Sequence, residues 1–253
     1  AGLAATGKCA LCQHQHDDEF HQMWECSGLE QTPQLTTTDY LKTRARNVGR
    51  QQPAIWVRGL MPTTWLQLPE TPTTLTLYTF GDLVDHHDPW ILGAYWWFSD
   101  GSGGEQGNND LLRRCGWSLV GFEPHTTEPK GGQYGNLPDD PQTVPRAELF
   151  PLLRLAQLTK GTTHLWTDSS YVCNYYASTK AKNQYGANAD LWHQLWRLLH
   201  ARPGKIHVHK VKAHEPETKV LNGTMDLYTW LGNTMADAYA DLAASLHQHT
   251  PED

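Results

Sequence analysis

The sequence lacks any long hydrophobic run. Its 253 residues contain no apolar stretch that approaches the ~20 consecutive residues needed to span a membrane. No signal peptide, internal repeat or low-complexity tract is visible either, which argues against a membrane or secreted protein. We therefore expect an intracellular protein, nuclear or cytoplasmic. The opening letters AGLAATGK resemble mid-chain sequence, so we also expect a piece of a longer polypeptide.

Cysteine is scarce and odd in number. Three of the five cysteines lie within the first 26 residues, among histidines, which suits a metal site in a reducing compartment better than a disulfide framework. The segment KCALCQHQHDDEFHQMWECSG has a C-x2-C-x8-H-x4-C spacing, and three thiolates with one imidazole form a closed structural zinc set. The predicted ligands of one Zn²⁺ are Cys9, Cys12, His21 and Cys26. His14 and His16 are alternatives for the imidazole, and free cysteines are the alternative to a metal site.

Acidic residues outnumber basic ones, 27 to 20, which argues against a generic nucleic-acid coat protein. One segment reverses this balance. Between Cys173 and His214 the chain has seven basic residues against one acid, Asp190, which gives a local charge of +6. Such a segment is either a solvated helix face or a surface that faces phosphates, and the sequence leaves both interpretations open.

Composition divides the chain into three stretches. Residues 1–28 contain the Cys/His cluster, residues 29–89 are rich in Thr, Pro and Gln, and residues 90–250 alternate strand and helix patterns. We predict a zinc knuckle, a connector or arm with a short helix near 39–50, and a larger domain, in that order. The last stretch shows three strands, a helix, a strand, two helices, a strand and a helix, which indicates a mixed α/β sheet with helices on its faces. Its first strand is predicted at 91–100, ILGAYWWFSD.

Four acidic residues hold suggestive places in this domain. Asp100 and Asp168 end predicted strands, while Glu148 and Asp237 lie on predicted helices. The carboxyl ends of neighbouring strands are where α/β sheets gather ligands. The glycine-rich segment after Asp100 would also let a metal or a polymer backbone approach closely. Taken singly, each acid has a structural explanation as a turn residue, a helix cap or a solvated side chain.

Six motifs in fixed order resemble those of a known family. WFSDGSGG, RAELFPLLRLAQ, LWTDSSYVCNYY, NADLWHQLW, KVKAH and GNTMADAYADLA resemble the successive motifs of the ribonuclease H family, over roughly residues 90–249. The resemblance implies a ribonuclease H-like α/β fold: a five-stranded mixed sheet with its first three strands antiparallel and helices on both faces. It also implies an endonuclease that hydrolyses the RNA strand of RNA/DNA hybrids.

The resemblance assigns roles to individual residues. It implies that two Mg²⁺ ions, for which Mn²⁺ can substitute, are bound by Asp100, Glu148, Asp168 and Asp237. His214, in KVKAHEP, matches a histidine that assists proton transfer or product release. Backbone near the glycines would read the 2′-hydroxyls of RNA, and basic residues would hold the phosphates of the DNA strand. The predicted substrate-binding residues are Gly101, Ser102, Gly103, Lys180, Lys182 and Asn188.

The chain departs from the family pattern in three places. Val144 and Pro145 stand where family members often carry Asn or Gln, and Pro151 should kink or delay the helix that carries Glu148. The loop between His214 and Asp237 is longer than in the compact cellular enzymes. These departures concern affinity and loop behaviour more than the chemistry.

The Cys/His segment resembles the CCHC knuckle beside the reverse transcriptase or ribonuclease H domains of non-LTR retrotransposons. This implies a retroelement-type ribonuclease H attached to a reverse transcriptase domain, monomeric as a fragment and without a membrane partner. One rival is a catalytically silent ribonuclease H-like module that binds nucleic acid or connects domains. Another is a 3′-5′ exonuclease, which would carry a D-x-E pair where this chain has D-G-S, and a third is a purely structural zinc module.

Overall fold

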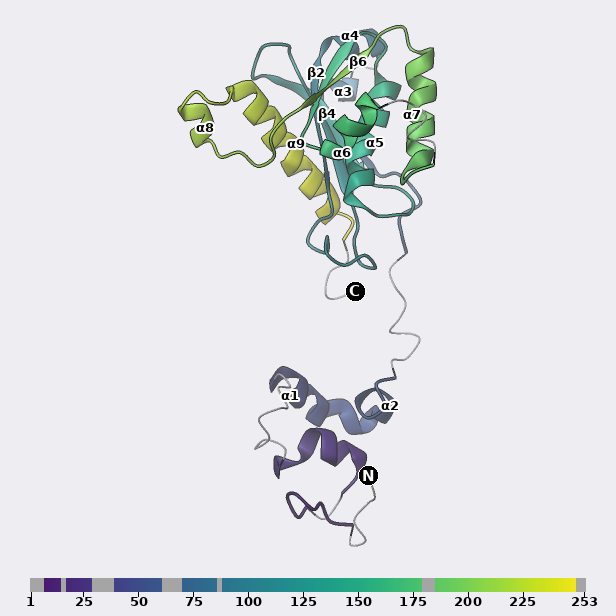
Figure 1. The fold of residues 1–253 in the computed structure, drawn as a ribbon, viewed down its shortest axis with the longest axis vertical. Coiled ribbons are helices and arrows are strands. Elements are labelled where there is room, and N and C mark those ends of the chain that lie inside the picture. Colours follow the sequence, from purple (N-terminus) through teal and green to yellow (C-terminus); the bar gives the residue numbers. More distant parts are fainter. Residues whose placement is uncertain are drawn as a thin grey trace. The chain divides into compact units, whose positions relative to one another are not determined.

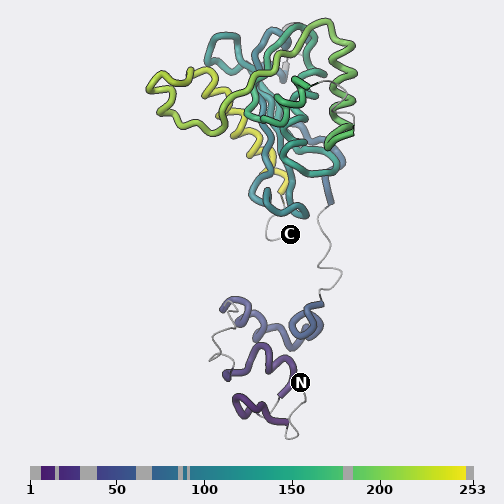
Figure 2. Tube along the Cα trace, in the orientation of Figure 1, coloured from purple at the N-terminus to yellow at the C-terminus, as the bar shows by residue number. Residues whose placement is uncertain are grey.

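The computed structural model describes residues 7–14, 17–28, 39–60, 70–85, 88–178 and 185–248. The chain forms two compact units, Ala1–Leu68 and Pro69–Asp253, and Figure 2 traces the path of the backbone through each of them. Among the described residues, no helix is both long enough and apolar enough to cross a membrane.

The first unit joins the Cys/His cluster to the helices that follow it. Its described helices are the π-helical turn η1 His21–Glu25, α1 Asp39–Val48, the 3-10 turn η3 Gly49–Gln51 and α2 Pro53–Trp56. The Trp24 indole donates to the Trp56 carbonyl at 2.6 Å. Arg50 lies over the Phe20 ring, 5.0 Å from its centroid, and donates to Glu25 and Asp18. The helix expected near 39–50 is present, and it packs against the cluster.

The second unit is built on one six-stranded mixed sheet, with the strand order β1-β4-β3-β2-β5-β6. Its strands are β1 Leu77–Gly81, β2 Trp96–Ser102, β3 Gly116–Phe122, β4 Pro129–Asn136, β5 Thr163–Thr167 and β6 Ile206–Lys210. Strands β2, β3 and β4 pair antiparallel, and β5 and β6 run parallel to β2. The predicted mixed α/β class and the antiparallel first three strands are confirmed.

The predicted count of five strands is wrong by one. Strand β1 pairs antiparallel with β4 at the edge of the sheet and lies in the stretch expected to be a connector. The predicted strand over 91–100 is also corrected at its start, because Pro89–Ala94 form helix α4 and β2 begins at Trp96. Pro89 suits the first turn of a helix, where its missing N–H removes no hydrogen bond.

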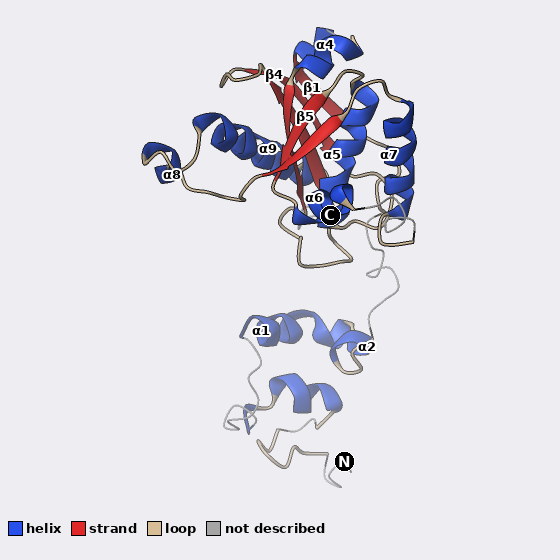
Figure 3. Cartoon of the chain, turned by 45° about the horizontal axis from the view of Figure 1, so that its top comes forward, coloured by secondary structure: helices blue, strands red, loops and turns tan. Residues whose placement is uncertain are grey.

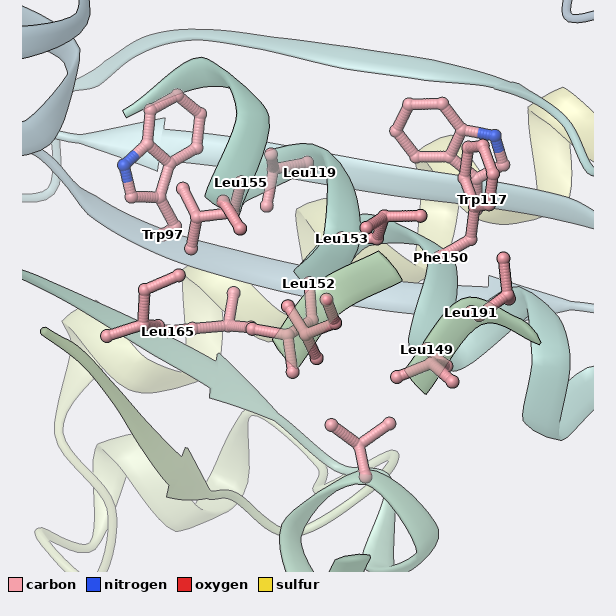
Figure 4. Packing of buried hydrophobic residues seen from close by; sticks show 14 of the residues in the cluster. Trp97, Trp117, Leu119, Leu149, Phe150, Leu152, Leu153, Leu155, Leu165 and Leu191 are labelled. Carbon is pink, nitrogen blue, oxygen red and sulfur yellow. The ribbon is translucent and has the colours of Figure 1, made fainter. Parts of the chain in front are cut away.

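Helices cover both faces of the sheet, as Figures 1 and 3 show. The helices of this unit are α3 Asp82–Asp85, α4 Pro89–Ala94, α5 Val144–Leu158, α6 Ser170–Ala177, α7 Ala189–Ala201, α8 Thr218–Leu221 and α9 Leu227–Ser245. Trp97 and Leu119 face α5, α6 and α7, whereas their strand neighbours Phe98 and Val120 face α9. This period of two follows from the strand geometry. Figure 4 shows the larger core, where leucines of α5 interlock with Trp97 and Trp117.

Helix α9 approaches the sheet closely because the residues on both sides of the contact have small side chains or none. A Cβ added to Gly116 of β3 would lie 2.2 Å from the backbone nitrogen of Ala244. The fully buried face of α9 is made of alanines: Ala236, Ala240, Ala243 and Ala244. The close contact fixes α9 along β2 and β3, and so fixes where the acids of α9 lie.

Helix α5 begins at Val144 and continues through Pro151 to Leu158, so the helix start is not delayed to the far side of this proline. Near its start, buried Arg146 binds Asp190 of α7 through two hydrogen bonds of 2.7 and 2.6 Å. Asp190, the single acid of the basic segment, is therefore the partner of an arginine in the neighbouring helix. Trp192 of α7 is fully buried in the core.

Candidate functional site

The sheet brings two of the predicted acids together. Ser99 of β2 pairs with Thr167 of β5 in parallel register, so the next residues, Asp100 and Asp168, emerge side by side. Asp168 directly follows β5, whereas β2 continues to Ser102, two residues beyond its predicted end at Asp100. Glu148 joins them from the first turns of α5. That helix lies against β2 because Gly101 has no side chain: a Cβ there would be 2.4 Å from the backbone nitrogen of Glu148.

Oxygen atoms of Asp100, Glu148 and Asp168 all lie within 4.8 Å of one another. The fourth predicted acid, Asp237 of α9, lines the same cavity, and its charge is one of the causes that raise the pKa of Asp100. Hard cations such as Mg²⁺ prefer oxygen donors and bind through one or two carboxylates while keeping some waters, so this donor set fits them. A cavity of about 590 Å³ opens on the group, and it is lined by Asp100, Gly101, Ser102, Gly103, Val144, Glu148, Asp168, Ala213, His214, Asp237 and Asp241.

The electrostatics of the site favour a cation. Burial, together with the charges of Asp168 and Asp237, raises the pKa of Asp100 to about 8. Burial also raises the pKa values of Glu148 and Asp168, although Ser169 and Lys210 partly offset the shifts. Clustered carboxylates repel one another, and a bound cation would remove that repulsion.

Neighbouring polar groups hold the acids in place. Asp100 accepts from the Gly101 amide at 2.7 Å, and the Ser169 hydroxyl donates to Glu148 at 2.6 Å. Lys210 of β6 donates to the backbone carbonyls of Asp168 and Val211. Sequence reasoning assigned no role to Ser169 or Lys210. Ser169 directly follows Asp168, and the alternation of KIHVHKVKAH could have placed Lys210 beside the end of β5.

His214 lies at the rim of the site, in the long loop between β6 and α9. It has a left-handed backbone conformation, with φ of 46°. Its Nδ1 atom lies 3.7 Å from an Asp237 carboxylate oxygen, and its side chain is 74% exposed. The same loop carries α8, which projects away from the sheet (Figure 1). The histidine is therefore open to solvent yet close to one of the clustered acids.

The predicted substrate-binding residues separate into three cases. Gly101, Ser102 and Gly103 line the cavity beside the acids. Asn188 precedes α7 with φ of 62°, and its amide donates to the Tyr171 hydroxyl at 3.1 Å, away from the lining of the cavity. Lys180 and Lys182 lie outside the described residues.

The second group of candidate ligands is in the first unit. Ligand atoms of Cys9, Cys12, His21 and Cys26 all lie within 4.8 Å of one another. The Sγ atoms of Cys9 and Cys26 are 3.6 Å apart, and Cys12 Sγ is 3.2 Å from His21 Nε2. Two thiolates bound tetrahedrally at ~2.3 Å to one zinc ion would be about 3.8 Å apart, so the arrangement fits that ion.

The two other histidines of this segment were alternatives for the imidazole ligand. His14 stacks on His21 with ring centroids 4.9 Å apart, but the converging group contains His21. His16 lies outside the described residues. A backbone hydrogen bond from Cys12 is the main cause that lowers the pKa of the Cys9 thiol to about 7, whereas burial raises that of Cys26 to about 11. Close packing of thiols with no disulfide among the described cysteines is typical of a metal site.

Comparison with known proteins locates the larger unit in a family. Residues 93–245, more than half of the chain, match the family described as RNase H. No curated protein sequence matches the chain. Among solved structures, the RNase H domain of PFV is 19% identical, with a TM-score of 0.44 over 60% of this chain and 95% of that one.

Two further solved structures match the chain at low identity. The protease-reverse transcriptase of prototype foamy virus is 18% identical with a TM-score of 0.47, and the match covers 66% of this chain and 22% of that chain. RNase H1 from Halobacterium salinarum NRC-1 is 14% identical with a TM-score of 0.41, over 60% of this chain and 97% of the other.

Proposed function

Because the chain belongs to the ribonuclease H family, we propose that it is an endonuclease that hydrolyses the RNA strand of RNA/DNA hybrids at the carboxylate site. The observation that carries the proposal is the convergence of Asp100, Glu148 and Asp168 within 4.8 Å at the ends of two adjacent strands. The glycine-rich backbone after β2 borders the same cavity, which leaves room for a polymer beside the acids.

The acids would act as ligands for two divalent cations. When bound, such a pair of ions activates a water, neutralises charge on the phosphate and stabilises the leaving oxygen. Asp100 converges with Glu148 and Asp168 and also feels the charge of Asp237, so it would be the ligand that the two ions share. Glu148 and Asp168 would complete one position, and Asp237 would serve the other. The Ser169 hydroxyl, 2.6 Å from Glu148, keeps that carboxylate turned into the site.

His214 would exchange a proton with solvent at the rim. Its imidazole is exposed and its Nδ1 lies 3.7 Å from Asp237, so it can reach groups at the cavity mouth while staying hydrated. Histidine is the side chain most often used as a general acid or base, which suits proton transfer during product release.

Substrate selection would depend on reading both strands. Backbone groups of Gly101, Ser102 and Gly103 would contact the 2′-hydroxyls of the RNA strand across its wide minor groove. The basic segment with Lys180, Lys182 and Asn188 would hold phosphates of the DNA strand, which makes affinity sensitive to salt. The local charge of +6 in an otherwise acidic chain supports this assignment.

We further propose that Cys9, Cys12, His21 and Cys26 hold one structural zinc ion, and that the cations at the acids are Mg²⁺, replaceable by Mn²⁺. The thiolate and imidazole donors suit the softer ion and the carboxylates the harder ones. The context we propose is a retrotransposon polyprotein, in which a reverse transcriptase domain makes the hybrid that this chain then degrades.

A cleavage assay on four labelled substrates tests the proposal. The protein, loaded with zinc, is incubated with Mg²⁺ and an RNA/DNA hybrid, single-stranded RNA, duplex RNA or duplex DNA. We expect cuts in the RNA strand of the hybrid alone. Tight hybrid binding without cleavage in Mg²⁺ or Mn²⁺ would instead identify a catalytically silent nucleic-acid-binding module.

A further inference from the structure

A hydrogen-bond relay connects helix α9 to the glycine-rich segment Ser102–Gly104, which begins at the last residue of β2. The Ser102 hydroxyl donates to Asp241 Oδ1 at 2.5 Å, and the Ser102 oxygen accepts from the Gly104 amide at 3.0 Å. One hydroxyl has a single proton to donate, so the bond to Asp241 turns its lone pairs toward Gly104. Asp241 therefore fixes the orientation of the hydroxyl as well as its place.

Gln248, three residues beyond the end of α9, makes a second set of contacts with this segment. Gln248 accepts from the Glu105 amide at 3.2 Å and donates to the Gly103 carbonyl at 3.4 Å. Gly104 adopts a φ of +62°, a left-handed conformation that glycine adopts at little cost. The backbone of residues 102–105 is thus held in one conformation by hydrogen bonds to Asp241 of α9 and to Gln248.

The relay lies at the candidate active site. Ser102 and Asp241 both line the cavity that contains the clustered acids. Asp241 follows Asp237 by one helical turn, so the two carboxylates share a face of α9 and repel each other. An aspartate whose only role was solvation would be better placed on another face of the helix.

A metal-ligand role for Asp241 is less well supported. The described oxygen atoms that converge tightly are those of Asp100, Glu148 and Asp168. Asp241 instead has an oxygen engaged by Ser102, on the side of the cavity where the backbone turn lies. Asp241 is therefore placed to act on the site through the Ser102 hydroxyl rather than as a direct metal ligand.

We infer that Asp241 is a positioning residue for substrate: through Ser102, the last residue of β2, it holds the backbone Ser102–Gly104 in the shape that contacts the RNA strand. The inference rests on the proposed function, because it assigns a determinant of hybrid affinity to the same site. It predicts that losing the relay weakens substrate binding and leaves the chemical step intact, since the clustered acids keep their own contacts.

Steady-state kinetics on the hybrid, with zinc-loaded full-length protein, test the inference. Asp241→Ala and Ser102→Ala should each raise KM about tenfold, the size expected for losing one hydrogen bond to a charged group, with kcat changed less than about twofold. The double variant should be no worse than either single variant, because both remove one interaction. Asp241→Asn keeps an acceptor oxygen and should restore most of the affinity.

Controls separate this role from general stability. Ser245→Ala, at an exposed position on the same helix, should leave KM unchanged. In amide hydrogen exchange, Gly104 should lose protection in Asp241→Ala and Ser102→Ala but keep it in Asp241→Asn. A fall in kcat at constant KM would assign Asp241 to the metal site, and an Asp241→Asn as weak as Asp241→Ala would show that charge, not the relay, matters. Either result, or no change in Asp241→Ala, overturns the inference.

Hybrid binding distinguishes this inference from the proposed function. If the wild-type protein does not cleave, the dissociation constant is measured in Ca²⁺ by fluorescence anisotropy. A tenfold weakening in Asp241→Ala, reversed in Asp241→Asn, would keep the positioning role while the nuclease proposal fails. A wild-type protein that binds no hybrid, or variants that bind it equally well, would overturn the positioning role.

Discussion

The two groups of candidate metal ligands differ in how the chain builds them. The thiolates and imidazole of the first unit come from one short segment, between residues 9 and 26, so their spacing alone predicted a site. The carboxylates of the second unit come from Asp100, Glu148, Asp168 and Asp237, on two strands and two helices. Only the packing of the sheet brings them together. One site is local and the other is a product of the fold.

The difference extends to stability. In the first unit the fully buried apolar side chains among the described residues are few: Cys9, Phe20, Cys26 and Ala45. The second unit has a large core in which tryptophans and leucines are fully buried. Small units with so little apolar burial usually depend on a metal or another crosslink to stay folded. On the function proposed above, a zinc ion would therefore stabilise the first unit, whereas the core of the second unit positions the acids even though they repel one another.

Removing a proposed zinc ligand should have the largest effect on folding, and that effect should be confined to the first unit. Structural zinc contributes about 10 kcal/mol or more to the folding of small zinc domains. In Cys12→Ser we expect one bound zinc to fall to none and α1 to lose hydrogen-exchange protection, while α5 and β2 stay protected. Cys173→Ser, in the second unit, is the matched control and should keep its zinc. Protection of α1 without zinc would show that the first unit does not depend on the metal.

Substituting an acid of the second unit should separate activity from stability. Asp100→Asn should lower the hybrid cleavage rate at least about a thousandfold, equivalent to about 4 kcal/mol. Without added Mg²⁺ the same variant should unfold at a higher temperature than the wild type, because it removes a buried, repelled carboxylate. A variant that loses both activity and thermal stability would contradict the idea that the site opposes folding. Thermal unfolding and single-turnover cleavage measure the two effects.

The pH dependence of stability provides a third test. The folded protein holds the Asp100 proton up to a pKa of about 8, above the usual value of 3.8, so between these values the native state binds more protons than the unfolded state. Stability of the zinc-loaded protein without Mg²⁺ should therefore fall as pH rises, by up to about 4 kcal/mol between pH ~5 and ~8, since one proton corresponds to about 1.4 kcal/mol per pH unit. Mg²⁺ should reverse the loss, and Asp100→Asn should flatten the curve. A stability that rises over this range would contradict the account.

The smallest expected effect on cleavage comes from substituting His214, at the rim of the carboxylate cavity. His214→Ala should lower kcat about tenfold, or about 1.4 kcal/mol, because general acid-base assistance is lost while the acids remain. His193→Ala, at an exposed position on α7, is a matched control that should leave kcat unchanged. A loss near that of Asp100→Asn would assign His214 to the metal site itself.

Sequence reasoning succeeded where the pattern was long or local. The mixed sheet followed from the strand and helix order, and the convergence of the Cys/His side chains followed from their spacing. It failed at short, ambiguous runs. The letters ILGA, residues 91–94, fit a strand or a helix, and in the structure they belong to the helix α4 that begins at Pro89. Strand β1 was missed because LYTFG follows a stretch rich in Thr and Pro, and its pairing with β4 is a long-range contact.

The site contacts that the sequence did not predict join residues that are far apart in the chain. Ser102 and Asp241 are 139 residues apart, and Arg146 and Asp190 are 44 apart, so no local pattern joins them. Their partners follow only once α9 packs on Gly116 and α7 packs beside α5. Asp241 did carry one sequence signal, a second carboxylate one turn after Asp237, but the same signal fits a solvated helix face.

The measurement that tests the central claim most directly is single-turnover cleavage of an end-labelled RNA/DNA hybrid in Mg²⁺ by wild-type protein, Asp168→Asn and the exposed control Asp110→Asn. We predict cuts in the RNA strand by the wild type and by Asp110→Asn, with none by Asp168→Asn at matched zinc content. Equal cleavage by Asp168→Asn, or no cleavage by any of the three while the hybrid stays bound, would contradict a carboxylate site that the fold assembles for hydrolysis.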